Sequence, residues 1–381
     1  MKKNLCFVST TRADFDLQKE VIISLEKKFK CTLICSGTHF EKQFGNSIRY
    51  INKFKIKKKI FCKIENLLNV NFDKLHSKYL RSFYKVLKKI NPDAICLFGD
   101  RSETFIISFV AYSLEIPIIH FSGGEITSGS LDDAYRHSIT KMSELHFTTT
   151  NQHRKRVIQL GENPKTVFNC GISSLSNFKN FKFLKQEKIE KDLKIKFSKK
   201  NFFVTLHPEK SIKDNFKKFS FVFLAIKKFQ DISVFISSPN IDKGFKEIQK
   251  LIKYTCKNSS RWYYLKNLGH QYFFSTVKLC DVFIGNSSSG ISEIPSLHVP
   301  TVNIGSRQNG RPRSFSIIDT NFEVKNIQKA IKKSMSKNFQ KKIKKSKNLF
   351  YRNDSLKIIN QNILKFLNSK NKQKLFFNVN F

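Results

Sequence analysis

The first half of the chain alternates short, continuous apolar runs with stretches whose apolar residues recur every three or four positions. Continuous runs of this length are typical of parallel strands buried on both faces. Helical spacing is clearest over Leu75–Ile90, and Asn91-Pro92-Asp93 ends it. The alternation predicts parallel strands joined by crossover helices. The runs predicted as strands are Leu5–Val8, Thr32–Cys35, Ala94–Phe98, Ile116–His120 and Leu145–Thr148.

The pattern weakens from Ile172 to about Lys200 and then resumes, which predicts a second α/β domain. Its predicted strands are Phe202–Leu206, Ser233–Ile236, Val282–Ile284 and Thr301–Ile304. We therefore predict two doubly wound domains, with helices from about Glu323 to Phe366 closing the second. The predicted boundaries are residues 1–171 for the first domain, 172–200 for a linker, 201–366 for the second domain and 367–381 for a polar tail.

The charge of the chain raises the question of a nucleic-acid partner. The formal net charge is +41 over 381 residues, and such a field attracts phosphates. The excess lysine is spread over the polar positions of almost every predicted helix, together with abundant Asn, Ile and Phe, as codon choice in an AT-rich genome would produce. We therefore expect no nucleic-acid partner, although a basic surface would help to attract an anionic substrate.

Cysteine usage and the apolar runs indicate the compartment. The eight cysteines are scattered and form no C-x-x-C pair or zinc-site spacing, so we expect reduced core cysteines and no metal. The N-terminus contains no signal-peptide core. The longest apolar stretch, Phe105–Phe121, is broken by Glu115 and Pro117 and is too short to span a membrane. These features predict a cytoplasmic protein with no membrane partner.

Polar residues follow the predicted strands of the first domain, where open α/β sheets bind ligands. Arg12 lies in the loop after the first strand, and Asp100 follows Ala94–Phe98. Gly123-Gly124-Glu125 comes after the next strand and leads to a helix with two i,i+4 pairs, Asp132/Arg136 and Asp133/His137. Ordinary ion pairing on a helix surface is the alternative explanation of those pairs.

The second domain also carries polar residues at strand ends. His207 follows Phe202–Leu206, and a structural histidine is the alternative there. Asn286, Ser287 and Ser288 follow Val282–Ile284 and precede Glu293, a layout suited to a diphosphate and a ribose, although a capped serine-rich turn would look the same. Arg307 and Arg311 follow the last strand and could bind phosphate. The chain has no G-x-G-x-x-G or P-loop, so we expect no NAD or ATP cofactor.

Taken in order, these motifs resemble the UDP-N-acetylglucosamine 2-epimerase family, and within it the hydrolysing branch that supplies sialic, legionaminic and related nonulosonic acid pathways. The resemblance runs from Thr11-Arg12-Ala13-Asp14 to Arg313. The motifs between them are Gly99-Asp100-Arg101, Gly123-Gly124-Glu125, the helix Asp132–Met142, His207-Pro208-Glu209, Asn286–Gly290 and Arg307-Gln308. It implies a GT-B-like fold of two Rossmann-like domains with the nucleotide sugar in the cleft between them, C-terminal helices that cross back toward the first domain, and no metal. An oligomer of identical chains is compatible with the sequence.

The family reaction implied by this resemblance removes the proton at C2 of the sugar and expels the nucleotide diphosphate, giving a 2-acetamidoglucal. The hydrolysing branch then adds water at C1 and a proton at C2, and it releases N-acetylmannosamine. The family pattern assigns acid/base roles to Asp100, Glu125 and Asp132. It assigns stabilisation of the leaving diphosphate to Arg12, Arg136 and His207, and nucleotide binding to Ser287, Ser288 and Glu293.

The sequence departs from the non-hydrolysing relatives at two positions. Those relatives carry a catalytic Glu two residues after the histidine that matches His120, and Ser122 stands there in this chain. The resemblance to hydrolysing relatives passes that role to Glu125. At position 132 the non-hydrolysing relatives have Glu, and the shorter Asp132 would leave room for water.

Four alternative functions follow from the same residues. One is the same reaction on a UDP- or GDP-linked 2,4-diacetamido-trideoxyhexose, which the sequence barely separates from the reaction on UDP-N-acetylglucosamine. The others are a non-hydrolysing epimerase, disfavoured by Gly123-Gly124-Glu125, a GT-B glycosyltransferase, disfavoured by the acidic cluster, and a basic nucleic-acid-binding protein, which leaves the strand-end carboxylates unexplained.

Overall fold

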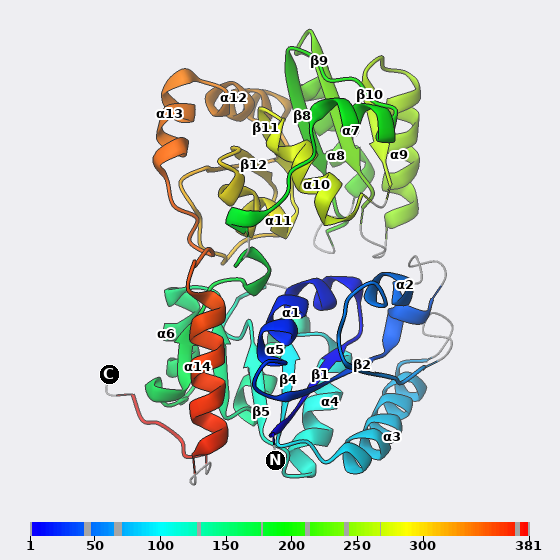
Figure 1. The fold of residues 1–381 in the computed structure, drawn as a ribbon. Helices are drawn as coiled ribbons and strands as arrows, with labels where there is room; N and C mark the ends of the chain where they lie inside the picture. The colour runs from blue at the N-terminus through cyan, green and yellow to red at the C-terminus, as the bar shows by residue number, and fades with distance from the viewer. Residues whose placement is uncertain are drawn as a thin grey trace. The chain divides into compact units, whose positions relative to one another are not determined.

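The computed structural model describes residues 2–41, 47–64, 71–127, 131–176, 178–209, 214–239, 244–266, 268–369 and 374–379. The chain divides into two compact units, each built around one parallel sheet (Figure 1). Unit 1 consists of Met1–Ile126, Ser130–Asn177 and Arg352–Phe381, and unit 2 of Thr127–Gly129 and Phe178–Tyr351.

Unit 1 contains a seven-stranded parallel sheet in the order β3-β2-β1-β4-β5-β6-β7. Its strands are β1 (Asn4–Ser9), β2 (Lys30–Cys35), β3 (Lys58–Phe61), β4 (Ala94–Phe98), β5 (Ile118–Phe121), β6 (Leu145–Thr148) and β7 (Val167–Asn169). Its helices are α1 (Arg12–Leu25), α2 (Ile48–Ile51), α3 (Phe72–Ile90), α4 (Ser102–Ser113), α5 (Leu131–Met142), α6 (Asn151–Gln159) and α14 (Ser355–Asn368), with short 3-10 turns at Gly37–Phe40, Pro164–Thr166 and Ser173–Leu175.

Helices cover both faces of this sheet because its central strands are apolar on both sides. Successive side chains of β1 point to opposite faces, so Leu5 and Phe7 pack with α1 and α14, whereas Cys6 and Val8 pack with α3 and α4. All four side chains are at most 6% exposed. This arrangement explains why the strands appear in the sequence as continuous apolar runs rather than as alternating ones.

The C-terminal segment belongs to unit 1, which corrects two predicted boundaries. The second domain was predicted to extend to residue 366, but α14 buries Ile359, Ile363 and Leu367 in the same core as α1 and β1. Burying three such side chains contributes about 1.5–3 kcal/mol each, which favours docking on unit 1. Residues 367–381 were predicted to be a polar tail, yet α14 continues to Asn368 and Lys374 bonds to the end of α5.

Unit 2 contains a six-stranded parallel sheet in the order β10-β9-β8-β11-β12-β13. Its strands are β8 (Lys200–Thr205), β9 (Ile232–Ser237), β10 (Trp262–Leu265), β11 (Val282–Gly285), β12 (Thr301–Ile304) and β13 (Ile317–Thr320). Its helices are α7 (Gln186–Leu193), α8 (Asn215–Ile226), α9 (Phe245–Lys257), α10 (Gly269–Lys278), α11 (Ser288–Ser292), α12 (Val324–Ser334) and α13 (Lys337–Lys345), with 3-10 turns at Phe178–Asn180 and Ile294–Leu297.

The segment predicted as a linker, residues 172–200, contains ordered structure in both units. The 3-10 turn Ser173–Leu175 packs beside α1 in unit 1, and α7 belongs to unit 2. The units therefore divide at Asn177 and Phe178 rather than near Gly171. Within the described residues, every helix is too short or too polar to cross a membrane.

Candidate active site

Each sheet has a point where the strand order reverses, and the candidate residues gather at these two points. In unit 1 the reversal lies between β1 and β4, and in unit 2 between β8 and β11. The loops after neighbouring strands leave in opposite directions at such a point and open a crevice at the carboxyl ends of the strands. Arg12 and Asp100 follow β1 and β4, and His207 and Asn286 follow β8 and β11.

Arg136 is the centre of the unit 1 cluster. This α5 residue is 1% exposed, and its guanidinium pairs directly with the Asp100 carboxylate. It also donates to Asp133 Oδ1 at 3.0 Å and to the backbone oxygen of Glu125 at 2.8 Å. Three of the predicted catalytic residues, Asp100, Glu125 and Arg136, therefore lie together.

The surroundings of Asp100 favour the protonated form of its carboxyl group. Burial raises the pKa of its carboxyl, the adjacent Arg136 opposes that rise, and the nearby carboxylates of Asp132 and Glu125 raise the pKa further. A carboxyl group whose pKa is raised is better suited to general acid/base chemistry at neutral pH. Asp100 is thus electrostatically coupled to the two other predicted acid/base carboxylates.

Helix α5 also carries the predicted pair of Asp133 and His137, whose side chains lie 3.5 Å apart. The neighbouring strand β5 contributes His120, which is fully buried and contacts the oxygen of Gly99 at 2.9 Å. Burial lowers the pKa of His120 to about 3, so this imidazole is neutral. Its contact with Gly99 holds the loop that carries Asp100.

Arg12 stands on the other side of the strand reversal, as the first residue of α1. Thr11 caps this helix in a capping box with Asp14, which fixes the start of the helix. The Arg12 guanidinium lies 4.7 Å from the ring centroid of Tyr50 and 3.9 Å from Asp16. Its side chain remains 39% exposed, so it is accessible to an anion.

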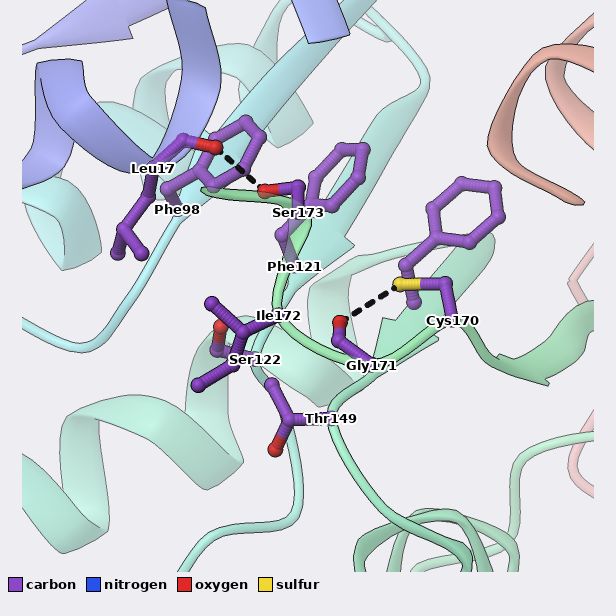
Figure 2. Close-up of a pocket in the computed structure, with 10 residues that line it drawn as sticks. Leu17, Phe98, Phe121, Ser122, Thr149, Cys170, Gly171, Ile172 and Ser173 are labelled. Carbon is purple, nitrogen blue, oxygen red and sulfur yellow. Dashed lines mark hydrogen bonds between the residues drawn. The ribbon is translucent and has the colours of Figure 1, made fainter. Parts of the chain in front are cut away.

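A small pocket opens at the carboxyl ends of β4, β5 and β6 (Figure 2). Phe98 and Phe121 stack at 4.1 Å between ring centroids and form its apolar wall. Ser122 and Thr149 contribute hydroxyl groups to the lining. Ser122 has a φ of 67°, a left-handed conformation that is unusual for serine and places the Gly123-Gly124-Glu125 turn directly after β5.

In unit 2 the side chain of Asn286 joins the two loops at the strand reversal. Its Oδ1 accepts from the His207 backbone at 2.7 Å, and its Nδ2 donates to the His207 oxygen at 2.8 Å and to Glu209 Oε1 at 3.0 Å. Asn286, His207 and Glu209 are all at most 6% exposed. The predicted binding residue Asn286 therefore fixes the backbone that carries the predicted catalytic residue His207.

The loop after β12 closes on the same asparagine. Gln308 Nε2 donates to the Asn286 oxygen at 2.9 Å, and the Arg307 guanidinium donates to it at 3.3 Å. Burial, with a smaller contribution from the charge of Arg307, lowers the pKa of His207 to about 3. His207 is therefore a neutral imidazole at pH 7, which can donate a hydrogen bond to a departing phosphate but carries no charge.

The remaining predicted binding residues surround this network. Ser287 caps α11, and its hydroxyl accepts from the Ser289 backbone at 3.4 Å. Ser288 begins the same helix, and the half-buried Glu293 ends it. Arg311 is half-buried in the turn after Gln308, and its backbone nitrogen donates to the Gln308 oxygen at 3.4 Å. Three of these residues lie on or beside α11, after β11, and Arg311 lies in the loop after β12.

Sequence reasoning missed two residues in unit 2 and one in unit 1. Glu209 and Gln308 both bond to Asn286, and Thr149 donates to the Glu125 carboxylate at 3.1 Å. Glu209 and Gln308 belong to two motifs of the family resemblance, His207-Pro208-Glu209 and Arg307-Gln308. Membership in those motifs was the signal in the sequence that could have marked them as site residues. Among the described residues, His, Cys, Asp and Glu side chains form no cluster that could hold a metal ion.

Known proteins with similar sequences identify the family of this chain. Residues 23–364 match the family described as UDP-N-acetylglucosamine 2-epimerase. A Campylobacter jejuni protein named GDP/UDP-N,N'-diacetylbacillosamine 2-epimerase (hydrolyzing) is 36% identical over 341 residues, which cover 88% of each chain. The Escherichia coli polysialic acid biosynthesis protein P7 is 33% identical over 99% of this chain and 98% of its own length.

Solved structures resemble the whole chain in fold. The Neisseria meningitidis UDP-GlcNAc 2-epimerase bound to UDP-GlcNAc has a TM-score of 0.80 and 17% identity, covering 95% of this chain and all of that one. The Methanocaldococcus jannaschii enzyme in complex with UDP-GlcNAc and UDP has a TM-score of 0.76 and 18% identity, covering 95% and 99%. The predicted GT-B-like class, with two Rossmann-like parallel-sheet units, is confirmed. The chain therefore belongs to the UDP-N-acetylglucosamine 2-epimerase family and groups with its hydrolysing branch.

Proposed function

We propose that the protein is a hydrolysing 2-epimerase that converts UDP-N-acetylglucosamine to N-acetylmannosamine and UDP for the synthesis of a sialic-type acid. The observation that carries this proposal is the buried Arg136 held among Asp100, Asp133 and the Glu125 backbone, in a chain of this family. Carboxylates at such a site can remove and return a proton at C2, while a fixed cation stabilises charge on a leaving group.

The proposed reaction has two steps. Asp100, Glu125 and Asp132 supply the base that takes the C2 proton and the acid that returns one to the opposite face. The electrons of the C2–H bond form the C1–C2 double bond as the C1–O bond to the diphosphate breaks. Water then adds at C1 of the 2-acetamidoglucal, and C2 receives a proton.

The leaving diphosphate needs cations and hydrogen-bond donors. We assign this task to Arg12, Arg136 and His207, the last as a neutral donor because its pKa is about 3. Nucleotide binding is assigned to Asn286, Ser287, Ser288, Glu293, Arg307 and Arg311. Interactions that strengthen as charge develops on the diphosphate lower the barrier more than those already present with bound substrate.

A second candidate substrate is a UDP- or GDP-linked 2,4-diacetamido-trideoxyhexose, undergoing the same reaction. The names of the Campylobacter jejuni relative and of a Legionella pneumophila relative, 31% identical over 88% of this chain, favour it because both are called hydrolysing diacetylbacillosamine 2-epimerases. The name of the Escherichia coli relative, a polysialic acid biosynthesis protein, favours a sialic-type pathway.

Release of nucleoside diphosphate from a panel of nucleotide sugars tests the proposal. The purified protein is incubated separately with UDP-N-acetylglucosamine and with the UDP- and GDP-linked diacetamido sugars, and kcat/KM is measured for each. The highest value with UDP-N-acetylglucosamine is the expected result. A kcat/KM at least tenfold higher for a diacetamido sugar would identify that sugar as the substrate instead. No release of nucleoside diphosphate from any of these nucleotide sugars would reject the hydrolytic reaction.

A further inference from the structure

The Gly123-Gly124-Glu125 turn rests on the start of helix α6. Gly124 has a φ of 79°, and a Cβ at this position would overlap the backbone oxygen of His153. The Arg156 guanidinium donates to the Gly124 oxygen from the same helix. The second glycine is therefore required by the close approach of α6, which brings this helix directly behind Glu125.

A chain of hydrogen bonds connects that helix to the Glu125 carboxylate. Thr149 Oγ1 donates to Glu125 Oε1 at 3.1 Å and lies 2.8 Å from His153 Nδ1. A hydroxyl group has a single proton to donate, so while it donates to Glu125 its oxygen accepts from His153 Nδ1–H. Thr149 is 3% exposed and His153 is fully buried, which shields both contacts from water.

We propose that Thr149 and His153 are positioning residues for Glu125. This inference rests on the proposed function, because it takes Glu125 as one of the acid/base groups. His153 fixes the direction of the Thr149 hydroxyl, and the hydroxyl holds one carboxylate oxygen of Glu125 in place.

The same hydrogen bond stabilises the ionised form of Glu125. Other charges also act on that carboxylate: Asp100 is electrostatically coupled to it, Arg136 binds its backbone oxygen, and Arg156 binds the preceding residue. Asp132 couples to the same Asp100 group from α5. Against this background, loss of the Thr149 donor destabilises the ionised carboxylate of Glu125, because a hydrogen bond donated to the charged form favours ionisation.

The test compares Thr149→Val with Thr149→Ser and with wild type on a substrate that the wild type turns over. Valine keeps the shape but removes the hydroxyl. We expect Thr149→Val to lower kcat by about 10- to 100-fold, as loss of one hydrogen bond to a charged group would. We also expect the acidic limb of its pH–rate profile to move up by about one pH unit, with KM nearly unchanged. Thr149→Ser should keep most of the activity.

Three further variants separate a positioning role from a general loss of stability. Thr148→Val is the matched control, because Thr148 is also buried and ends β6 directly before Thr149, but its hydroxyl donates to the backbone oxygens of Thr150 and Phe168. It should retain kcat. His153→Asn keeps a donor near the position of Nδ1 and should retain more activity than His153→Leu.

The outcomes distinguish this inference from the proposed function. An inactive wild type rejects the function itself. An active wild type with an unchanged kcat and pH profile in Thr149→Val overturns the inference. Equal losses in Thr149→Val and Thr148→Val, matched by equal falls in melting temperature, also overturn it, because the effect would then be loss of packing.

Discussion

At the scale of single residues, Asp100 and Arg136 each need the other's charge in their buried environment. Arg136 is almost completely buried and needs an anionic partner, while Asp100 is held beside two further carboxylates, Asp132 and Glu125. A buried charge that loses its partner is destabilising, so the pair also fixes the geometry of α5 relative to β4. The same contact serves the fold and the proposed chemistry.

Replacing Asp100 tests its assigned role. Asp100→Asn keeps the size of the side chain but removes the group that exchanges a proton, so we expect kcat to fall by about a thousandfold. The rate of nucleoside diphosphate release measures this effect. Asp93→Asn is the matched control, because Asp93 lies at the opposite end of the same strand, where it accepts from the Asn4 backbone at 2.7 Å.

The control variant should keep normal turnover. Retention of more than a tenth of the wild-type kcat by Asp100→Asn would remove this carboxylate from the proton-transfer steps. A comparable loss in both variants would attribute the effect to the fold of β4 rather than to the site.

Sequence reasoning identified these residues through their position after strands. Asp100, Glu125 and His207 all follow apolar runs, and the carboxyl ends of parallel strands meet at one edge of a sheet. The hydrogen bonds that hold these residues in place could not be predicted from their position after strands. Glu209 bonds to Asn286, 77 positions away, and only the folded chain brings such partners together.

At the scale of elements, Gly124 determines how closely the turn and α6 can approach. Gly124→Ala adds a Cβ that meets the His153 backbone oxygen and also strains a left-handed residue. We expect a loss of stability of about 3 kcal/mol or more, beyond the 1–2 kcal/mol of the backbone strain alone. Thermal melting should show this as a fall of roughly 2–4 °C per kcal/mol.

Gly244→Ala is the matched control for that substitution. Gly244 has a φ of 93°, so alanine is strained there too, but its nearest neighbour would be the Pro208 side chain at an ordinary 3.7 Å. The fall in melting temperature should therefore be clearly smaller than in Gly124→Ala. Equal falls in the two variants would show that contact with α6 does not constrain the turn.

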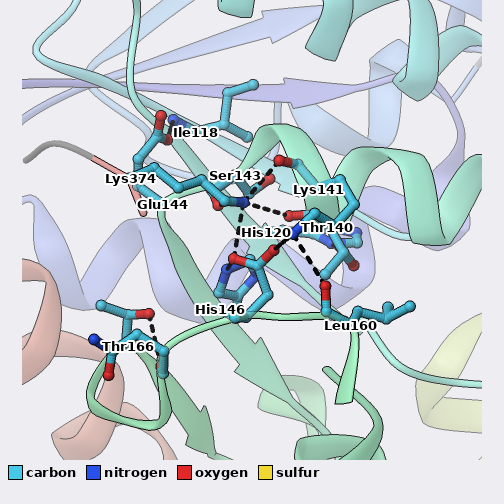
Figure 3. Close-up of polar contacts among 12 residues, drawn as sticks. Ile118, His120, Thr140, Lys141, Ser143, Glu144, His146, Leu160, Thr166 and Lys374 are labelled. Atoms are coloured by element: carbon cyan, nitrogen blue, oxygen red, sulfur yellow. Dashed lines mark hydrogen bonds and ion pairs between the residues drawn. The ribbon is translucent and has the colours of Figure 1, made fainter. Parts of the chain in front are cut away.

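Lys374 connects the C-terminal segment to the end of α5. Its ammonium donates to the backbone oxygens of Lys141 and Ser143 at 2.7 and 2.6 Å, and it pairs with the buried Glu162 at 2.8 Å (Figure 3). Although burial alone would raise the pKa of Glu162, its contacts with His146, Lys141 and Lys374 lower it to about 2. The ammonium thus satisfies carbonyl groups that the end of a helix leaves unpaired.

We expect Lys374→Met to lower stability by about 1–3 kcal/mol, because several hydrogen bonds to a charged group are lost together. Denaturant unfolding measures the change. Lys155→Met, at an exposed position on α6, should have almost no effect. Identical unfolding curves for Lys374→Met and wild type would contradict a supporting role for the segment.

The strands that the sequence did not reveal are the edges of the two sheets. β3, β7, β10 and β13 are the outermost strands, and all of them were missed. Central strands are buried on both faces and form continuous apolar runs, whereas β3 and β13 have no buried residue and contain Lys or Asp. A short, half-exposed strand has no distinctive pattern, because its identity comes from the neighbour to which it bonds.

At the scale of the whole molecule, buried neutral histidines make the protein sensitive to acid. Burial lowers the pKa of His39 to about 4, and of His120 and His207 to about 3, from an ordinary value near 6.5. The unfolded chain therefore binds more protons than the folded one below pH 6.5. The stability from keeping these groups neutral is present above that pH and is lost as the pH falls toward 4.

We expect the free energy of unfolding to decrease by up to about 1.4 kcal/mol per pH unit for each of the three histidines between pH 6 and 4. Denaturant unfolding at a series of pH values measures the slope. His39→Gln should reduce the slope by the share of one histidine. A stability that is constant from pH 6.5 to 4.5 would contradict the burial of these groups as neutral imidazoles.

The large positive charge belongs to the molecule as a whole rather than to one site. A net charge of +41 opposes compaction through self-repulsion, which the hydrophobic cores of the two units must offset. The fold class was predicted from the alternation of apolar runs, and the candidate site from residues at strand ends, and neither prediction depends on this charge. The same field would draw an anionic nucleotide sugar toward the protein.

In the proposed reaction, this chain breaks the bond to the nucleotide while it exchanges the proton at C2. Proton NMR of UDP-N-acetylglucosamine with the purified protein in deuterated water follows both events at once. We predict free UDP together with N-acetylmannosamine that carries deuterium at C2. Accumulation of UDP-N-acetylmannosamine without free UDP, or release of N-acetylglucosamine with its C2 proton retained, would contradict the claim.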